Sequence, residues 1–298
     1  MAHGCGLCHD HVRGGAGHYG GLSALHEQPA QGRKPMNRGN RVLLACVYWA
    51  FVLYVFVPLL LMVLMGFKDS KFIGFPIRSW TLDWYTGIFS DAEVISTFTY
   101  SVVIAVLSTL ISIFVGTWIA VLLQGRRFFG RAVVFGLTIL PAVVPGIISA
   151  IAFRVYARWL GIEPGMGAII WSHAVHNVPF VALVVMARLS TLPKSQIEAA
   201  RDLGADPLIA FLRITLPYLV PAILGASIFC LLLSFDDFVR SFFLGGYEPT
   251  LPVLIFAKLR SGMSPEINAI ATFALVLTAI VGLWAERFTR RMNKDAET

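Results

Sequence analysis

"EAARDLGADPLIAFLRITLP", residues 198–217, is the most charged and turn-broken stretch in the middle of a very apolar chain. Pro193, just before it, suits the first turn of a helix, where a missing N–H costs nothing. Gly204 is typical of a left-handed helix C-terminus. Asp206 followed by Pro207 is typical of an N-cap and the first position of a helix. The stretch therefore predicts two short helices joined by a glycine turn.

The composition of the whole chain places this stretch in a membrane protein. Of the 298 residues, 57% are hydrophobic and 14% are charged, and the mean hydropathy is +0.73. Soluble domains carry about 25% charged residues. Uncharged runs long enough for a crossing helix of roughly 20 residues cover residues 42–67, 94–123, 132–153, 164–187, 214–235 and 267–285. Because open sheet edges are not tolerated in lipid, we predict an all-α membrane protein with six transmembrane helices.

Basic residues predict the orientation of these helices. With six spans both termini lie on one side, and Lys and Arg on that side outnumber those on the other by two to one. Cytoplasmic loops carry such an excess. We therefore expect a multi-pass membrane protein with both termini cytoplasmic, in which residues 198–217 form a cytoplasmic loop between spans four and five.

Residues 1–36 differ from the rest of the chain, because they are rich in Gly and His and contain no apolar run. This composition predicts a disordered extension and not a signal peptide. Met36 directly precedes the first span, so the extension is also compatible with a gene start placed too early. The transmembrane domain is then residues 37–298.

The extension contains a cysteine motif that invites a second interpretation. Cys5, Cys8 and His9 have the spacing of a covalent haem attachment site, and with His11 they could bind zinc. Haem attachment occurs outside the cytoplasm, however, and no apolar sequence surrounds the motif for zinc to organise. We expect neither haem nor zinc here. Cys46 and Cys230 lie in predicted spans, where we expect small buried apolar residues.

The segments on the opposite side contain shorter features. Trp80, Trp84 and Tyr85 suit the aromatic belt of a membrane interface. The apolar run of residues 249–257 is too short to cross, so we predict a surface or re-entrant helix there.

Two adjacent acids follow the fifth predicted span. Asp236 lies 19 residues past Pro217, roughly 29 Å along a helix and near the outer boundary. Arg240 can pair with Asp236 at i,i+4 or with Asp237 at i,i+3. One arginine fully satisfies one carboxylate, so the other could face a cation on a transport path.

Three further polar residues in or near the spans have two interpretations each. Glu266 either stabilises the start of the sixth helix or adds to an acidic outer vestibule. His173 and His176 could bind a metal, but no acid or cysteine accompanies them in the sequence. We expect them to form interhelical hydrogen bonds instead.

The sequence contains no recognisable catalytic or phosphate-binding motif. A GxxxxGK[ST] phosphate loop needs glycine before lysine, and no lysine of this chain follows a glycine. Serine-elbow GxSxG and zinc-binding HExxH motifs are also missing. The second short helix carries Arg213 as its one basic residue, which argues against a DNA-reading helix-turn-helix. We expect a protein that is not an enzyme, has no catalytic or metal-binding residues and binds no nucleic acid.

The stretch that opens this section resembles the cytoplasmic loop of ATP-binding-cassette (ABC) importer permeases. Their signature is Glu-Ala-Ala, three residues, Gly, nine residues, Ile, one residue and Leu-Pro. Here residues 198–200, Gly204, Ile214 and residues 216–217 occupy all seven fixed positions.

The resemblance implies the fold of a type I ABC importer permease, with the loop docked as a coupling helix on a separate ATPase subunit. The residues that it assigns to ATPase coupling are Glu198, Ala199, Ala200, Gly204, Ala205, Asp206 and Leu208. It also implies that this chain holds no cofactor and that ATP is used by an ABC ATPase dimer. The other implied partners are a second permease subunit, which we expect to be a different chain, and an extracytoplasmic solute-binding protein.

Three further stretches resemble the spermidine/putrescine branch of these permeases. They are "WTLDWY" (residues 80–85), "SFDDF" (residues 234–238) and residues 250–272, and the likeness extends over residues 41–288. It implies a protein of the bacterial inner membrane that transports polyamines inward, with Asp236, Asp237 and Glu266 along the substrate path. The alternative solutes are an amino-acid-like compound or ferric iron. A more distant alternative is a membrane redox protein that uses the motif of residues 5–9.

Overall fold

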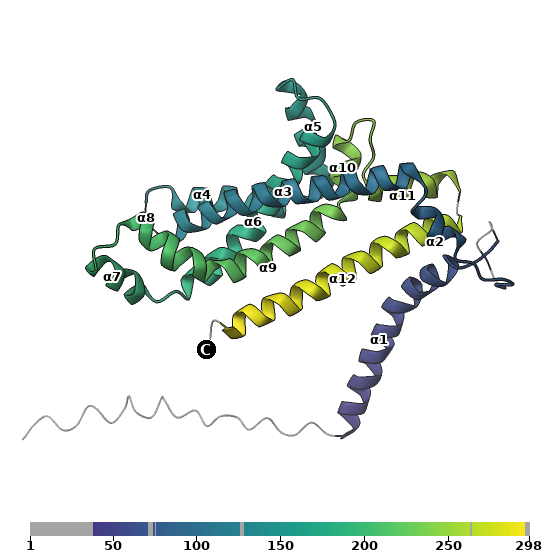
Figure 1. Cartoon of the computed structure of the whole chain (residues 1–298), viewed down its shortest axis with the longest axis horizontal. Helices are drawn as coiled ribbons and strands as arrows, with labels where there is room; N and C mark the ends of the chain where they lie inside the picture. Colours follow the sequence, from purple (N-terminus) through teal and green to yellow (C-terminus); the bar gives the residue numbers. More distant parts are fainter. Residues whose placement is uncertain (1–37, 71–73, 75, 126–127, 263, 296–298) are drawn as a thin grey trace, which may run out of the picture. The chain divides into compact units, whose positions relative to one another are not determined.

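A computed structural model describes residues 38–70, 74, 76–125, 128–262 and 264–295 (Figure 1). The chain divides into two units, residues 1–58 and 59–298. The predicted extension, residues 1–36, and its motif of Cys5, Cys8, His9 and His11 lie outside the described residues.

The described residues are almost entirely helical, as the sequence predicted. Within these ranges, β-structure is limited to one isolated bridge between Lys68 and Trp80. The helices are α1 (Arg38–Met65), α2 (Asp83–Ile88), α3 (Ala92–Gly125), α4 (Arg131–Val143), α5 (Gly146–Trp159), α6 (Met166–Ser190), α7 (Lys194–Asp202), α8 (Pro207–Ala210), α9 (Leu216–Phe235), α10 (Phe238–Leu244), α11 (Leu251–Ser261) and α12 (Pro265–Asp295). A π-helical turn, Phe211–Thr215, joins α8 to α9.

Five continuous helical segments in the described part of the chain are long and apolar enough to cross a membrane. They are Gly39–Met65, Ala92–Gly125, Met166–Ser190, Pro207–Phe235 and Pro265–Thr289, and they match the first, second, fourth, fifth and sixth predicted spans. The bent pair α4–α5 supplies a sixth if it is counted as one span. The short helix expected near residues 249–257 is also present, as α11.

The third predicted span, residues 132–153, is broken in the structure. Helices α4 and α5 are separate, and the chain bends by 109° between them. Val144 between them is extended, with φ −69° and ψ 129°, because a proline disfavours the helical conformation in the residue before it. Pro145 also lacks the N–H that would bond to the carbonyl of Pro141 in a continuous helix. The run breaks for this reason, although its composition suits a span.

In the first unit, the described helix is the part of α1 that ends at Pro58. It is apolar on every face, and from Gly39 onward every side chain except that of Val52 is exposed. Cys46 is among the exposed residues, so the prediction of a buried Cys46 is wrong. The reason is that no second described helix in this unit covers α1. A helix that is apolar all round suits a lipid environment.

In the second unit, α3, α6 and α9 pack together around small residues. The face that α3 buries carries Thr97, Ser101, Ala105, Ser108, Ser112, Gly116 and Ala120. At Gly116 an added Cβ atom would lie 2.7 Å from the Cβ atom of Val181 on α6. Small residues let the backbones of membrane helices approach closely, so Gly116 sets the spacing of α3 and α6.

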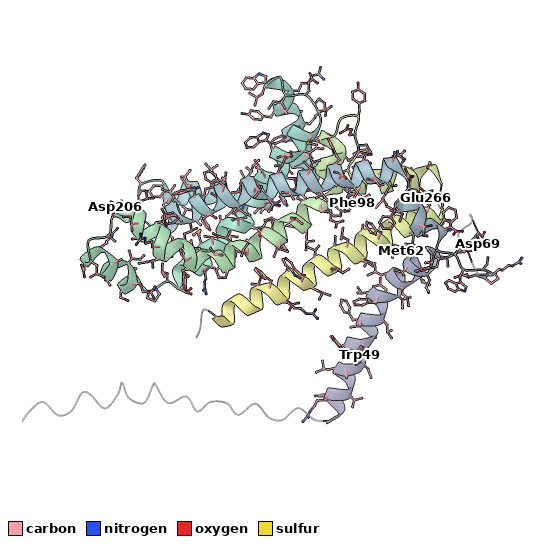
Figure 2. All side chains as sticks on the ribbon, viewed as in Figure 1. Trp49, Met62, Asp69, Phe98, Asp206 and Glu266 are labelled. Atoms are coloured by element: carbon pink, nitrogen blue, oxygen red, sulfur yellow. The ribbon has the colours of Figure 1, made fainter. Side chains whose placement is uncertain are left out.

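The short helices lie at the two ends of this second unit. Helices α7 and α8 lie at one end, and α2 and α11 lie near the other (Figure 1). Asp206, before α8, and Glu266, in the first turn of α12, mark these opposite ends (Figure 2). Glu266 is therefore far from the predicted coupling loop, and Asp236 and Asp237 follow the end of α9 that lies away from α8.

Candidate functional site

The loop between α6 and α9 has the local structure that its sequence predicted. Helix α7 begins directly after Pro193, which occupies the N-cap position. Gly204 has φ +83°, a conformation that costs a residue with a Cβ atom about 1–2 kcal/mol. The Asp206 side chain accepts a hydrogen bond from the Leu208 N–H at 3.4 Å, and Pro207 follows in the first turn of α8. The glycine turn and the N-cap are both confirmed.

This loop exposes apolar as well as charged side chains. Glu198, Ala199 and Leu208 are exposed, Ala200 and Ala205 are half-buried, and α7 buries none of its residues. Leu203, at the turn, is 89% exposed. Apolar residues grouped on an exposed helical loop mark a surface that another protein can cover. The structure thus brings the predicted coupling residues together on one short segment.

A cleft of about 1110 Å³ lies among α9, α10, α11 and α12. Its walls are mostly apolar and include Phe229, Phe238 and Phe256. Asp236, Asp237, Arg240 and His176 also line it. The cleft therefore combines aromatic surface with two carboxylates that the sequence singled out.

Asp237 and Arg240 are paired with each other. Their side chains form an ion pair at i,i+3, and both are at least nine-tenths buried. The second oxygen of Asp237 accepts a hydrogen bond from the Arg240 backbone N–H at 2.9 Å, which caps α10. Of the two pairings left open by the sequence, the structure has the one with Asp237.

Asp236 has a different environment from its neighbour. It directly follows α9, and it is exposed where it lines the cleft. Among the residues that the structure describes, no side chain forms a hydrogen bond or ion pair with the Asp236 carboxylate. The Asp236 carboxylate can thus contact a cation in the cleft, whereas the charge of Asp237 is already balanced by Arg240.

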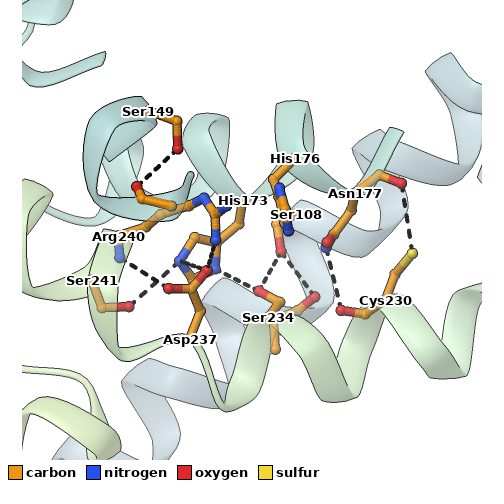
Figure 3. A network of polar contacts seen from close by, with 12 residues as sticks. Ser108, Ser149, His173, His176, Asn177, Cys230, Ser234, Asp237, Arg240 and Ser241 are labelled. Atoms are coloured by element: carbon orange, nitrogen blue, oxygen red, sulfur yellow. Dashed lines mark hydrogen bonds and ion pairs between the residues drawn. The ribbon is translucent and has the colours of Figure 1, made fainter. Parts of the chain in front are cut away.

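A buried polar cluster supports this part of the cleft (Figure 3). The Nδ1 atom of His173 lies 2.7 Å from the Oγ atom of Ser234, which lies 2.8 Å from the Oγ atom of Ser108. The other ring nitrogen of His173 lies 3.5 Å from Ser241 Oγ and 4.0 Å from the Asp237 carboxylate. The cluster links α3, α6, α9 and α10.

The sequence predicted interhelical hydrogen bonding for both histidines, and this is confirmed. His176 Nδ1 lies 3.3 Å from the Pro141 carbonyl, which Pro145 cannot satisfy because it has no N–H. The serine partners of His173 were missed. Their signal was weak: Ser108 and Ser234 are polar residues in long apolar runs, and nothing in the sequence pairs them.

Glu266 lies in a separate charged cluster centred on Lys258. The Lys258 ammonium lies 2.8 Å from Glu266, 3.7 Å from Glu93 and 3.9 Å from Asp91. Burial lowers the pKa of Lys258, but the hydrogen bond and charge of Glu266, with the charges of Glu93 and Asp91, raise it overall above 10.5. The cluster joins α11 to the starts of α3 and α12, and its carboxylates outnumber its ammonium group.

The described helices are mostly apolar, with an exposed helical loop at one end of the second unit and an acid-lined cleft away from it. The family described as "Binding-protein-dependent transport system inner membrane component" matches residues 112–297. The chain belongs to this family.

Two relatives from Escherichia coli (strain K12) match most of the chain. The spermidine/putrescine transport system permease protein PotC is 32% identical over 247 residues, which cover 82% of this chain and 93% of PotC. The putrescine transport system permease protein PotI is 34% identical over 250 residues, which cover 81% of this chain and 89% of PotI.

Solved structures share the fold at lower sequence identity. A chain of a bacterial ABC transporter involved in the import of the acidic polysaccharide alginate superposes with a TM-score of 0.67 at 20% identity, covering 85% of this chain and 94% of that one. A chain of the MetNI methionine ABC transporter superposes with a TM-score of 0.58 at 20% identity, covering 66% and 94%. The fold is thus that of ABC importer permeases.

Proposed function

We propose that this chain is a permease subunit of an ATP-driven importer of polyamines such as putrescine and spermidine. The observation that carries the proposal is the likeness to PotC and PotI, which extends over more than four-fifths of the chain. The proposed complex contains a second, different permease subunit, an ABC ATPase dimer and an extracytoplasmic solute-binding protein.

The chemistry of the cleft supports a polyamine as the substrate. A polyamine consists of ammonium groups separated by methylene segments. The exposed Asp236 carboxylate offers a charge-assisted hydrogen bond to an ammonium group. The nearby rings of Phe238 and Phe256, whose centroids are 4.8 Å apart, offer apolar surface and cation–π contacts.

We assign different roles to the three pathway acids. Asp236 binds the substrate ammonium directly, and Asp237 holds Arg240 and the start of α10 in place. Glu266, with Asp91 and Glu93, gives the outer end of the path an excess of negative charge. Such a field raises the local concentration of a polycation and speeds its encounter with the protein.

The exposed loop supports coupling to the ATPase. We assign α7, the Gly204 turn and α8 to the cytoplasmic side, together with both termini, because basic residues are in excess there. Glu198 contacts the ATPase through its charge, and Ala199, Ala200 and Ala205 allow the close approach of a partner helix. Gly204, Asp206 and Leu208 form and present the docking helix. ATP binding moves this loop, and the spans alternate between outward-open and inward-open states.

Uptake by proteoliposomes tests the proposal. The complete complex is reconstituted with ATP inside the vesicles and the binding protein outside, and labelled spermidine and putrescine are added. We expect ATP-dependent accumulation that unlabelled polyamine abolishes and that arginine or ferric iron leaves unchanged. Accumulation of a different solute alone would keep the importer and refute the polyamine assignment.

A further inference from the structure

The end of α6 and the start of α9, which flank the loop, are joined by one contact. Arg188 lies in the last turn of α6, and Tyr218 lies in the first turn of α9, 30 residues later. The Arg188 Nε atom donates a hydrogen bond to the Tyr218 carbonyl at 3.3 Å. Its guanidinium carbon lies 4.1 Å from the centre of the Tyr218 ring. The Tyr218 hydroxyl lies 2.9 Å from the Thr191 Oγ1 atom, at the start of the loop.

This contact does not have the form of an ordinary ion pair. In the part of the chain that the structure describes, Arg188 has no carboxylate partner, and its contacts are the ring and the backbone carbonyl. A planar guanidinium suits stacking on an aromatic face, and a lysine ammonium does not reproduce it. Tyr218 packs against a buried apolar cluster that includes Val185 of α6 and Leu219 of α9. The contact therefore connects both ends of the loop to the buried core.

The loop is also connected to the spans through the junction of α8 and α9, and the helix is irregular at this junction. A π-helical turn, Phe211–Thr215, separates α8 from α9. Single π-turns interrupt the regular hydrogen-bond ladder and often occur at functional sites. Pro217 cannot donate a hydrogen bond to the Arg213 carbonyl, so this junction lacks a bond that a regular helix would have. A displacement of α8 could bend this junction without moving α9 as a unit.

We propose that Arg188 and Tyr218 are positioning residues that make α6 and α9 move together when the loop is displaced. The contact passes the movement of the loop to both helices and prevents the π-turn from absorbing it. The proposal rests on the coupling role proposed above for the loop. It predicts that breaking the contact separates ATP hydrolysis from transport and leaves binding of the ATPase intact.

The test uses the full reconstituted complex with four variants. Arg188→Gln and Tyr218→Leu remove the stacked contact. Arg188→Lys keeps the positive charge but lacks the planar guanidinium, and Tyr218→Phe removes only the hydroxyl. Three quantities are measured: ATPase subunits retained on purification, ATP hydrolysed, and polyamine taken up. We expect the first three variants to retain the ATPase subunits while uptake per ATP falls about tenfold. Tyr218→Phe should stay within about threefold of the unmodified complex.

Arg158→Gln is the matched control, because Arg158 is an exposed arginine in the last turn of α5. It should leave uptake per ATP unchanged. If uptake per ATP is unchanged in both Arg188→Lys and Tyr218→Leu, the proposal is overturned. Failure of every Arg188 and Tyr218 variant to retain the ATPase would also overturn it, because the contact would then serve assembly and not coupling. If the unmodified complex itself neither retains the ATPase nor takes up polyamine, the proposed function fails independently of these variants.

Discussion

Asp237 and Arg240 form an ion pair across the first turn of α10, and this pair distinguishes Asp237 from the adjacent Asp236. Asp237 is buried and holds two groups of Arg240, whereas Asp236 is exposed in the cleft. Two neighbouring carboxylates thus have separate tasks, and their substitution should have different consequences.

Asp236→Asn should weaken polyamine transport without weakening the fold. Loss of one charge-assisted hydrogen bond costs about 1.5 kcal/mol, equivalent to roughly a tenfold rise in the spermidine concentration for half-maximal uptake. Asp83→Asn, an exposed acid on α2, is the control and should change nothing. Equal half-maximal concentrations in the Asp236 variant and the unmodified protein would exclude Asp236 from the substrate path.

Asp237→Asn should destabilise the protein, because the buried Arg240 loses its charge partner. Removal of one member of a buried ion pair costs about 3–5 kcal/mol, which thermal unfolding in detergent measures. The double variant with Arg240→Gln removes both charges and should recover part of the loss. An unchanged unfolding midpoint in the single variant would contradict the structural role.

Glu198→Arg should prevent normal assembly with the ATPase. Glu198 is exposed on α7, so its replacement affects a partner surface and leaves the core intact. We expect the ATPase retained on purification to fall at least fivefold. Gln196→Arg adds a positive charge to the same helix outside the signature, and it should retain the ATPase. Normal assembly, transport and ATPase stimulation in the Glu198 variant would remove this residue from the coupling surface.

Gly204→Ala should impair coupling through the backbone alone. No atom lies within 4 Å of the added Cβ position, but φ is +83°. The strain of about 1–2 kcal/mol should reduce the affinity for the ATPase about five- to thirtyfold. Gly136→Ala, in α4, also meets no atom within 4 Å and has no positive φ. If both variants bind the ATPase equally well, the left-handed turn is not needed for docking.

Lys258→Met should cause a pH-dependent loss of stability. The folded protein raises the pKa of Lys258 above 10.5, because the contribution of Glu266, Glu93 and Asp91 exceeds that of burial. The stabilisation is therefore fully present below pH 10.5 and is lost as pH rises through the folded-state pKa. The variant should unfold a few degrees lower at pH 8, and its midpoint should converge with that of the unmodified protein at higher pH. A difference that is constant with pH would refute the ionic origin.

Local features of the loop were predictable from the sequence. The Gly204 turn and the Asp206–Pro207 helix start depend on the conformations that single residues allow, and the structure has both. The break of the third span had a signal in Pro141 and Pro145, but the apolar run outweighed it. The bend depends on the Val144 conformation and on His176 bonding to the freed Pro141 carbonyl.

Contacts between distant segments were not predictable. The choice of Asp237 over Asp236 depends on α10 starting directly after Asp237, and α10 packs against the distant helices α5 and α6. His173 and Ser234 are 61 residues apart, and Arg188 and Tyr218 are 30 apart. Single serine and arginine residues in apolar runs do not identify their partners. Such pairs are set by how α6 and α9 pack.

The measurement that tests the central claim most directly is ATP hydrolysis by the reconstituted complex across a panel of solutes. The panel contains putrescine, spermidine, amino acids and ferric iron, each presented with the binding protein. We predict stimulation by the polyamines alone, weakened by Asp236→Asn. Stimulation by an amino acid or by iron, with no response to putrescine or spermidine, would contradict the account.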